Sequence, residues 1–404
     1  MNFKKISLSP TYLYIVDIGS YKIRVSACSF LNKRVSILGY TEKRQDTNNF
    51  INQECRDIIW LSENINQTLK KLEWEIGIDI EKVVVNFPFG ELFVSTKKIN
   101  YKRDFPHSPL KEEELEKIIQ RAESISLRKL SEEIKEYSNL GKDELELILS
   151  RMNHVSIDGV EQERILGNEG INVRISLLNI FVPLSKYNLI NHLGNIIEKK
   201  IVKILPTEFC ITKLFQEDSL VIINIWATQT SISIKKEKEL IGVSKIGIGI
   251  NDLLSKISEN THETKIEIIE KLDTGLYIQE KKDFLDIWTA WVLIGIKEIV
   301  EEDICPKEFF IFGGGGNNMF MKEALQKLDF HKHDIRIITP LHFLEVRKEE
   351  YIWSIVDTDS DIIDRMSLDS IALIIETNNL LIKEKDIVSE SLKKVVTELW
   401  YNMA

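Results

Sequence analysis

The sequence predicts an α/β fold of two related lobes, with a small α+β subdomain inserted in the first lobe. Residues 14–27, YIVDIGSYKIRVSA, form an apolar run, a short polar turn and an alternating apolar run, and residues 221–234, VIINIWATQTSISI, repeat this pattern. A charged segment of different texture lies between the two copies, and a later apolar run at 308–312 leads into four glycines. Self-similar segments far apart in one chain indicate duplicated structural units.

The first block predicts most of one lobe. Alternation around a Gly-Ser turn indicates a β-hairpin, apolar residues at helical spacing indicate a helix, and the apolar run KVVVNF is typical of a buried strand. In order, we expect a hairpin at 12–29, a strand at 35–39, a helix at 52–76 and strands at 82–87 and 91–101.

The middle block predicts the inserted subdomain. Its charged segment at 108–146 begins with a plausible helix cap in SPLKEEELEKIIQRA and predicts helices, with a stop at Asn139-Leu-Gly. Strands at 154–159 and 173–182 and a helix at 184–199 follow.

The last block returns to the first lobe and then builds the second. A strand at 201–204 and a helix at 206–215 lead to the second hairpin from residue 220. Further strands are expected at 239–246, 308–312 and 334–338, and helices at 252–257, 265–275, 284–300, 319–328 and 367–380, before a last helical stretch. The domains predicted are 11–104 and 189–218 for the first lobe, 105–188 for the insertion, 219–382 for the second lobe and 383–404 for a hinge and terminal helix.

Composition excludes some classes of function. The 404 residues carry a net charge of −10, which argues against a nucleic-acid partner because such proteins need a basic face. The four cysteines are far apart in the sequence, as expected of free thiols in a reducing compartment. No signal peptide and no membrane-spanning apolar stretch is evident, so we expect a cytoplasmic protein.

The first hairpin turn carries groups suited to a phosphate. Gly19 lets a phosphate approach the backbone, Ser20 adds a hydroxyl, and Lys22 adds positive charge. Asp17 is a candidate to hold Mg²⁺ through water. A Gly-Ser turn is also common without any ligand, so this motif alone does not decide.

The strand–GGGG–helix pattern at 308–328 is a second candidate ligand loop. Gly313, Gly314, Gly315 and Gly316 would let a nucleotide lie against the backbone, although four glycines could also serve a sharp chain crossing. The loop matches neither the G-x-G-x-x-G dinucleotide pattern nor a G-K-[ST] phosphate loop.

Together these motifs resemble those of the actin-like ATPases, and in particular the bacterial cell-division protein family FtsA and its relative PilM. Two hairpins and a late strand–GGGG–helix follow the phosphate–phosphate–adenosine order of that superfamily. The stretch HVSIDGVEQERILGNEGINVRISLLNIFVP resembles the small subdomain peculiar to FtsA, the SHS2 domain, and DIRIITP and DSIALIIETNNLLI match the layout that follows. The resemblance covers most of the chain.

The resemblance implies duplicated RNase H-like domains with ATP and Mg²⁺ in the cleft between them. The hairpins containing Asp17 and Asn224 would grip the phosphates, and the glycine loop would face the adenosine. Lys271, one helical turn after Glu267, would lie near the ribose and base; an ordinary i,i+4 surface ion pair is an equal alternative.

The second hairpin departs from the family pattern. Asn224 and Trp226 stand where the family has Asp and Gly, whereas Thr230 keeps a hydroxyl. Asn lacks the charge that orients metal-bound water, and an indole would crowd a nucleotide. We therefore expect slow or absent hydrolysis. Trp226 could instead point into the core, as most tryptophans largely do.

The C-terminus carries an amphipathic stripe at helical spacing. Its apolar members are Leu392, Val395, Val396, Leu399, Trp400 and Met403. In FtsA-like proteins such a tail binds the inner membrane, whereas a similar stripe elsewhere more often packs on its own domain.

The sequence thus favours an FtsA-like, ATP-binding membrane adaptor. It would self-associate into filaments and tether an FtsZ-like partner to the cytoplasmic face of the membrane. The alternatives are a PilM-like scaffold for type IV pilus assembly and a nucleotide-free pseudo-ATPase. A sugar or acetate kinase of the same superfamily would need a catalytic carboxylate, and the sequence offers no convincing candidate.

Overall fold

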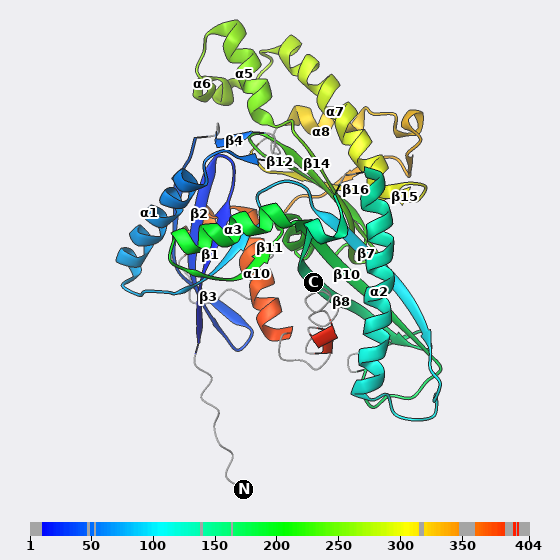
Figure 1. Cartoon of the computed structure of the whole chain (residues 1–404). Coiled ribbons are helices and arrows are strands. Elements are labelled where there is room, and N and C mark those ends of the chain that lie inside the picture. The colour runs from blue at the N-terminus through cyan, green and yellow to red at the C-terminus, as the bar shows by residue number, and fades with distance from the viewer. Residues whose placement is uncertain are drawn as a thin grey trace.

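The structure is a computed structural model with two lobes and a third, elongated unit beside them (Figure 1). It describes residues 10–46, 49–51, 54–137, 140–162, 165–314, 319–346, 360–383, 391–392 and 394–395.

The first lobe is built on a five-stranded sheet in the order β11-β6-β1-β2-β3. Strands β1 (Thr11–Ile18), β2 (Lys22–Leu31) and β3 (Arg34–Arg44) form an antiparallel meander, and β6 (Lys82–Asn86) and β11 (Lys200–Leu205) continue it in parallel. Helices α1 (Ile58–Ile76) and α3 (Leu184–Ile196) belong to this lobe, as does the short ribbon of β4 (Phe50–Ile51) and β5 (Glu54–Cys55). Asp57 caps the first turn of α1, and Gly77 ends it with a positive φ of 67°.

The second lobe repeats this sheet. Its order β14-β13-β12-β16-β18 has the same topology, with β12 (Leu220–Ile225), β13 (Thr230–Lys236) and β14 (Glu239–Ile246) antiparallel, and β16 (Glu308–Phe312) and β18 (His342–Phe343) parallel to β12. Each lobe therefore has three meander strands and two parallel strands in matching positions. This confirms the duplication that the repeated hairpin pattern predicts.

Helices α5 (Ile250–Thr261), α6 (Lys265–Lys271), α7 (Ile278–Val300) and α8 (Met319–Gln326) belong to the second lobe. A strand predicted at 334–338 is shorter than expected. It is β17 (Arg336–Ile337), which pairs with β15 (Ile304–Cys305) in a separate two-stranded sheet, after the short 3₁₀ helix η3 (Phe330–His333). The fifth strand of the main sheet is β18, which the sequence pattern did not reveal.

The inserted unit is larger at its start than the predicted range 105–188. Strand β7 (Phe93–Lys102), expected in the first lobe, pairs with β10 (Asn172–Pro183) in a sheet ordered β7-β10-β8-β9, and α3 contacts both this unit and the first lobe. The unit also contains α2 (Glu112–Tyr137), the 3₁₀ helix η2 (Lys142–Glu144), β8 (Leu145–Ile157) and β9 (Val160–Glu161). The prediction of helix as far as residue 146 was wrong at its end, because β8 begins at Leu145. The alternation of this segment is too weak to predict a strand, and pairing with β10 makes it one.

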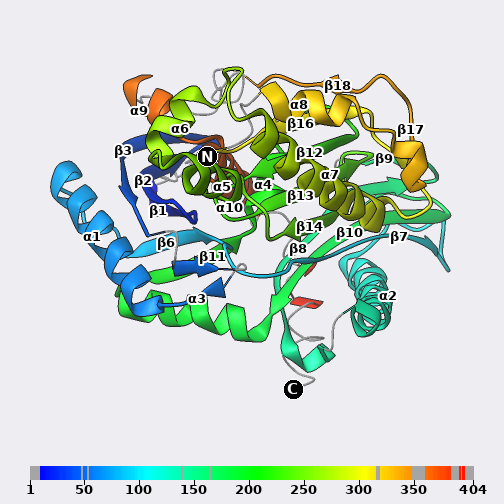
Figure 2. The same cartoon turned by 90° about the horizontal axis from the view of Figure 1, so that it is seen from above.

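Two helices lie between the lobes, as the view from above shows (Figure 2). Helix α4 (Thr207–Thr212) packs against α10 (Leu368–Lys383), which also contacts β1; the short α9 (Ser360–Arg365) precedes α10. One apolar core joins the first sheet and α10 to Ile222, Phe310 and Phe312 of the second sheet. A second core lies under α5 and α7. The lobes thus share a core through α4 and α10.

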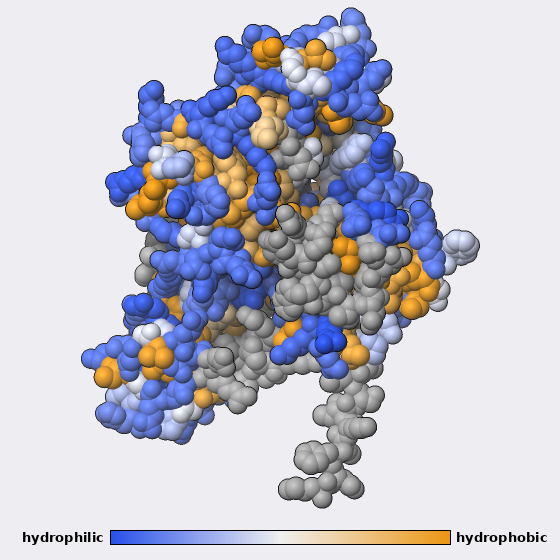
Figure 3. Space-filling model, turned by 180° about the vertical axis from the view of Figure 1, so that it is seen from behind, coloured by the Kyte–Doolittle hydropathy of each residue, from blue (hydrophilic) through white to orange (hydrophobic). Residues whose placement is uncertain are grey.

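No helix within the described ranges is long and apolar enough to cross a bilayer. In the view of Figure 3, hydrophilic surface predominates and apolar side chains form separate patches.

Candidate functional site

The first hairpin holds Asp17 at the end of β1, directly opposite Arg24 on β2. The Arg24 Nη1 atom donates to Asp17 Oδ2 over 3.0 Å, and Asn86 Nδ2, at the end of β6, donates to Asp17 Oδ1 over 3.4 Å. In the turn, the Gly19 N–H donates to the Lys22 carbonyl, and the Gln45 side chain donates to the Gly19 carbonyl. These hydrogen bonds fix the conformation of the turn without any ligand.

Both hairpins meet the first turn of α10. Ser367 Oγ and Ser370 Oγ donate to Asp17 Oδ2 over 3.2 and 2.9 Å, and Asn224 Nδ2 donates to Asp369 Oδ1 over 3.2 Å. Contact with one helical turn brings the ends of β1 and β12 together. We call this place, defined by Asp17, Asn224 and residues 367–370, the hairpin junction.

The hairpin junction is acidic. Burial, followed by the nearby Asp17 charge, raises the pKa of Asp369 to about 8. The Arg24 guanidinium opposes this rise, and the Glu208 carboxylate adds to it. Helix α4 meets the junction at Asn86, whose Nδ2 lies 3.4 Å from Thr207 Oγ1 and also 3.4 Å from Asp17 Oδ1.

The second hairpin has a wider turn than the first. Trp226 N donates to the Gln229 carbonyl over 2.8 Å, and the Trp226 and Ala227 carbonyls accept from Ile250 N and Asn251 N at the start of α5. Trp226 is partly buried and belongs to neither apolar core, so the expectation that it points into a core is not met. Its indole nitrogen is buried without a hydrogen-bond partner among the described residues.

The glycine loop lies against the end of β12. Gly313 has a φ of +93°, and a Cβ there would lie 2.4 Å from Asn224 Oδ1 and 2.5 Å from the Ile225 carbonyl oxygen. Only glycine fits this position, for reasons of both conformation and space. Gly314 follows with an open surround, whereas Gly315 and Gly316 lie outside the described residues.

Several buried polar atoms of the hairpins and of the elements beside them have no hydrogen-bond partner within the described part of the chain. They include Gln45 Oε1, Asn224 Oδ1, Trp226 Nε1 and Gln229 Oε1, and also Glu208 and Lys245, which face each other as an ion pair without hydrogen-bond geometry. Unpaired buried polar groups are costly, and native proteins usually pair them with a ligand, an ion or water. The junction therefore fits a polar ligand with both donors and acceptors, such as a nucleotide.

Three predicted site residues have other contacts. Thr230 is fully buried; its hydroxyl donates to the Ile248 carbonyl over 2.7 Å and accepts from Trp288 Nε1 over 3.1 Å, which leaves it no donor for a phosphate. Lys22 pairs with Glu42. Lys271 pairs with Glu263, not with Glu267. The Glu267 carboxylate instead accepts from the backbone N–H of Thr264, the N-cap residue of α6. Ser20, by contrast, is buried within the first turn.

The described part of the C-terminal stripe packs on the inserted unit. Leu392 and Val395 are buried in one cluster with Leu115, Ile118, Ile119 and Ala122 of α2, and Lys394 Nζ lies 2.8 Å from Glu116 Oε1. Val396, Leu399, Trp400 and Met403 lie outside the described residues. Of the two expectations for the tail, this contact agrees with packing on its own chain.

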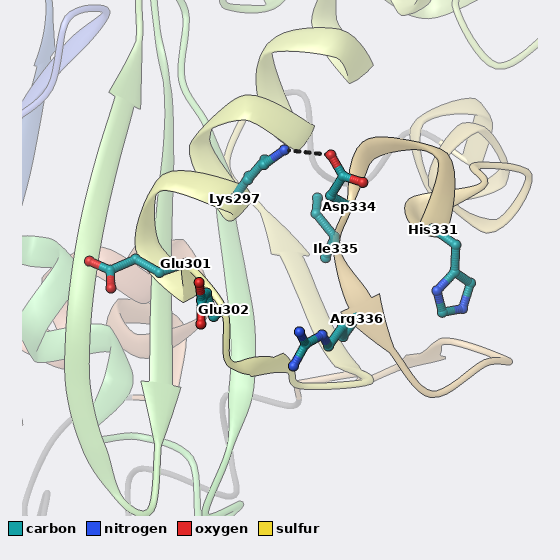
Figure 4. A pocket seen from close by; sticks show the side chains of 7 residues that line it. All are labelled: Lys297, Glu301, Glu302, His331, Asp334, Ile335 and Arg336. Atoms are coloured by element: carbon teal, nitrogen blue, oxygen red, sulfur yellow. Dashed lines mark hydrogen bonds and ion pairs between the residues drawn. The ribbon is translucent and has the colours of Figure 1, made fainter.

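A charged hollow of about 460 Å³ lies elsewhere, behind the C-terminal end of α7. Figure 4 shows Lys297 reaching Asp334 across it, while His331 points away. None of its lining residues belongs to either hairpin or to the glycine loop, and none of them was predicted as a site residue.

Sequence reasoning missed several residues of the junction. The sequence motifs assigned no role to Arg24, Asn86, Glu208 or Lys245. Strand register could have indicated Arg24, because it stands opposite Asp17 in the hairpin. The contacts of Asn86, Glu208 and Lys245 depend on how separate elements pack, which no local pattern contains.

Comparison with known proteins gives a fold. No family model matches the chain, and no curated protein sequence matches it. A solved PilM–PilN type IV pilus biogenesis complex is similar with a TM-score of 0.54 at 13% identity, over 93% of this chain and 97% of that chain.

Two more distant structures are EutJ, an ethanolamine utilization protein from Carboxydothermus hydrogenoformans, and apo psk41 ParM. EutJ has a TM-score of 0.44 at 11% identity, over 83% of this chain and 86% of its own. ParM has a TM-score of 0.36 at 12% identity, over 93% of this chain and 99% of its own. With the duplicated sheets and the similarity to the PilM–PilN complex, the chain has the two-lobed actin-like ATPase fold that the sequence predicted.

Proposed function

We propose that this protein is an ATP-binding, actin-like scaffold with slow or absent hydrolysis. The observation that carries the proposal is that both hairpins carry buried polar atoms without a hydrogen-bond partner among the described residues, and that the glycine loop lies against one of these atoms, Asn224 Oδ1. The Asp17–Ser20 turn, Asn224 and Gly313 would line the nucleotide, with Gly315 and Gly316 continuing the loop. Because Asn224 and Trp226 stand where the resembling family has an acid and a glycine, we expect binding with little hydrolysis.

The proposal is tested by thermal unfolding with added ATP. A ligand that binds only the folded state raises the melting temperature, by an amount set by its concentration relative to Kd. We expect ATP to stabilise the chain, and a coupled assay to show little phosphate release. An unchanged melting temperature at saturating ATP would leave a nucleotide-free scaffold as the better description.

We further propose that the scaffold self-associates and links an FtsZ-like partner to the cytoplasmic face of the membrane. An actin-like fold supports a nucleotide-dependent lobe angle, and hence polymer contacts that respond to nucleotide. A pilus-assembly scaffold of the PilM kind is the alternative. Pull-down with an FtsZ-like protein and with a PilN-like peptide distinguishes them.

The membrane link depends on the C-terminal stripe. Because Leu392 and Val395 are buried against α2, the tail must leave this site before both residues can enter a bilayer. Liposome co-sedimentation of the full chain against one that ends at Glu384 tests the link. Equal pelleting of the two chains would remove the membrane from the proposal.

A further inference from the structure

Equivalent rows of side chains cross the meander strands of the two lobes. In the first lobe, register places Asp17, Arg24 and Glu42 side by side on β1, β2 and β3. In the second lobe the same places hold Asn224, Ser231 and Lys245. Directly opposed residues share one face of a sheet. The first row is acid–base–acid, whereas the second has lost its acids and ends in a lysine.

Lys245 is a buried cation with unused hydrogen-bonding capacity. Only 3% of its side chain is exposed, and its Nζ lies 3.0 Å from Glu208 Oε1 on α4, one of the two helices between the lobes. The contact lacks hydrogen-bond geometry, so neither Lys245 Nζ nor the two Glu208 oxygens have a hydrogen-bond partner within the described ranges. A buried ion pair is favourable only when further hydrogen bonds complete it. A ligand carrying both acceptors and donors would do so.

The ammonium is linked to the hairpin junction through a short series of contacts. Lys245 Nζ stands 5.9 Å from the centre of the Phe87 ring, and the preceding residue, Asn86, bonds to Asp17 and to Thr207 beside Glu208. Glu208 in turn acts electrostatically on Asp369 of the junction. Lys245 is therefore a second cation, besides Arg24, in contact with the residues around this acidic site.

The carboxylates that could hold Mg²⁺ are already engaged. Asp17 Oδ2 accepts from Arg24, Ser367 and Ser370, and Asp17 Oδ1 accepts from Asn86. A hydrated Mg²⁺ would therefore have to bind through Asp17 Oδ1 alone or displace one of these donors. Asn224 is neutral, and the Glu208 carboxylate faces the Lys245 ammonium at 3.0 Å. Magnesium in nucleotide sites usually needs one or two available carboxylates in addition to the phosphates.

We propose that the hairpin junction binds a nucleoside triphosphate without Mg²⁺, and that Lys245 supplies the positive charge that a metal ion would otherwise bring. This inference rests on the proposed nucleotide-binding function and goes beyond it, because it assigns a residue and removes a cofactor that the family resemblance implies.

The test titrates the full chain with a fluorescent ATP analogue in excess Mg²⁺ and in excess EDTA, at equal ionic strength. Affinities in the two conditions should differ by less than about tenfold, which is 1.4 kcal/mol. Binding that requires Mg²⁺ would overturn the inference and leave the proposed function standing. Absence of binding in both conditions would overturn both.

Variants of Lys245 test whether this residue supplies the positive charge that binds the nucleotide. In EDTA, Lys245→Met should weaken binding by more than about tenfold. Lys236→Met, on the neighbouring strand and paired with Asp303, is the matched control and should bind as the wild type does. The double variant Glu208→Gln/Lys245→Met leaves no buried charge unpaired and should show the same loss, which separates lost affinity from poor folding. Unchanged affinity in the folded double variant would contradict the role of Lys245.

Discussion

Replacing Gly313 with alanine should destabilise the protein strongly. The φ of +93° is strained for any residue with a Cβ, at a cost of about 1–2 kcal/mol. The new Cβ would also lie 2.5 Å from the Ile225 carbonyl oxygen, a backbone atom that no rotamer change can move away. Such overpacking typically costs another ~1–3 kcal/mol. Together these effects predict a loss of about 2–5 kcal/mol in the free energy of unfolding.

Gly314→Ala is the matched control. A Cβ at Gly314 would have its nearest neighbour, the Ile225 carbonyl oxygen, at 4.0 Å, an ordinary contact. We expect a change within about 0.5 kcal/mol, as for most unconstrained surface positions. Urea unfolding followed by circular dichroism measures both variants. Equal stabilities of the two variants would refute the close approach of the glycine loop to the end of β12.

Three further predictions concern charges. Asp369→Asn should stabilise the protein most at high pH. Burial and Asp17 raise the Asp369 pKa to about 8, so the native state loses stability as the pH rises from the ordinary carboxyl pKa toward 8. The neutral asparagine avoids this loss. A gain in melting temperature that does not grow between pH 5 and pH 8 would contradict this. Asn224→Asp should lower the melting temperature, more at pH 8 than at pH 5, since it sets a third carboxyl beside Asp17 and Asp369 and replaces the donor to Asp369; a gain in stability at pH 8 would show that the junction tolerates the charge. Glu116→Lys should increase liposome pelleting, because it repels Lys394 and favours release of the tail; Glu113→Lys, with the same charge change on the exposed side of α2, is the control, and equal pelleting by the two would exclude the docked tail as the cause.

The fold was largely predictable because its signals are local and repeated. The alternating runs around Gly19 and after Asn224 mark two hairpins, and an apolar run before the glycines marks β16. Duplication then follows from similarity alone. The inserted unit was placed less well: β7 has the alternation of any strand, and only pairing with β10 assigns it to the inserted sheet.

The candidate site was predictable at the hairpins but not between them. Asp17 and Gly313 can be singled out from the sequence, because one precedes a Gly-Ser turn and the other opens a run of four glycines after an apolar strand. Arg24 and Asn86 contact Asp17 because of strand register and the packing of separate elements, and Ser370 contacts it from a helix that starts far along the chain. Thr230 is a residue that the sequence wrongly suggested for the site. Its hydroxyl matches the family pattern but is bonded to the Ile248 carbonyl and to Trp288.

Amide hydrogen exchange of the full chain with and without ATP tests the central claim most directly. If the hairpin junction binds nucleotide, ATP should slow exchange together in three separate segments: the turn after Asp17, the turn after Asn224 and the loop at Gly313. These segments adjoin only in the folded lobes, so joint protection locates the ligand. Protection confined to other regions, such as the charged hollow around Lys297 and Asp334, would contradict the account.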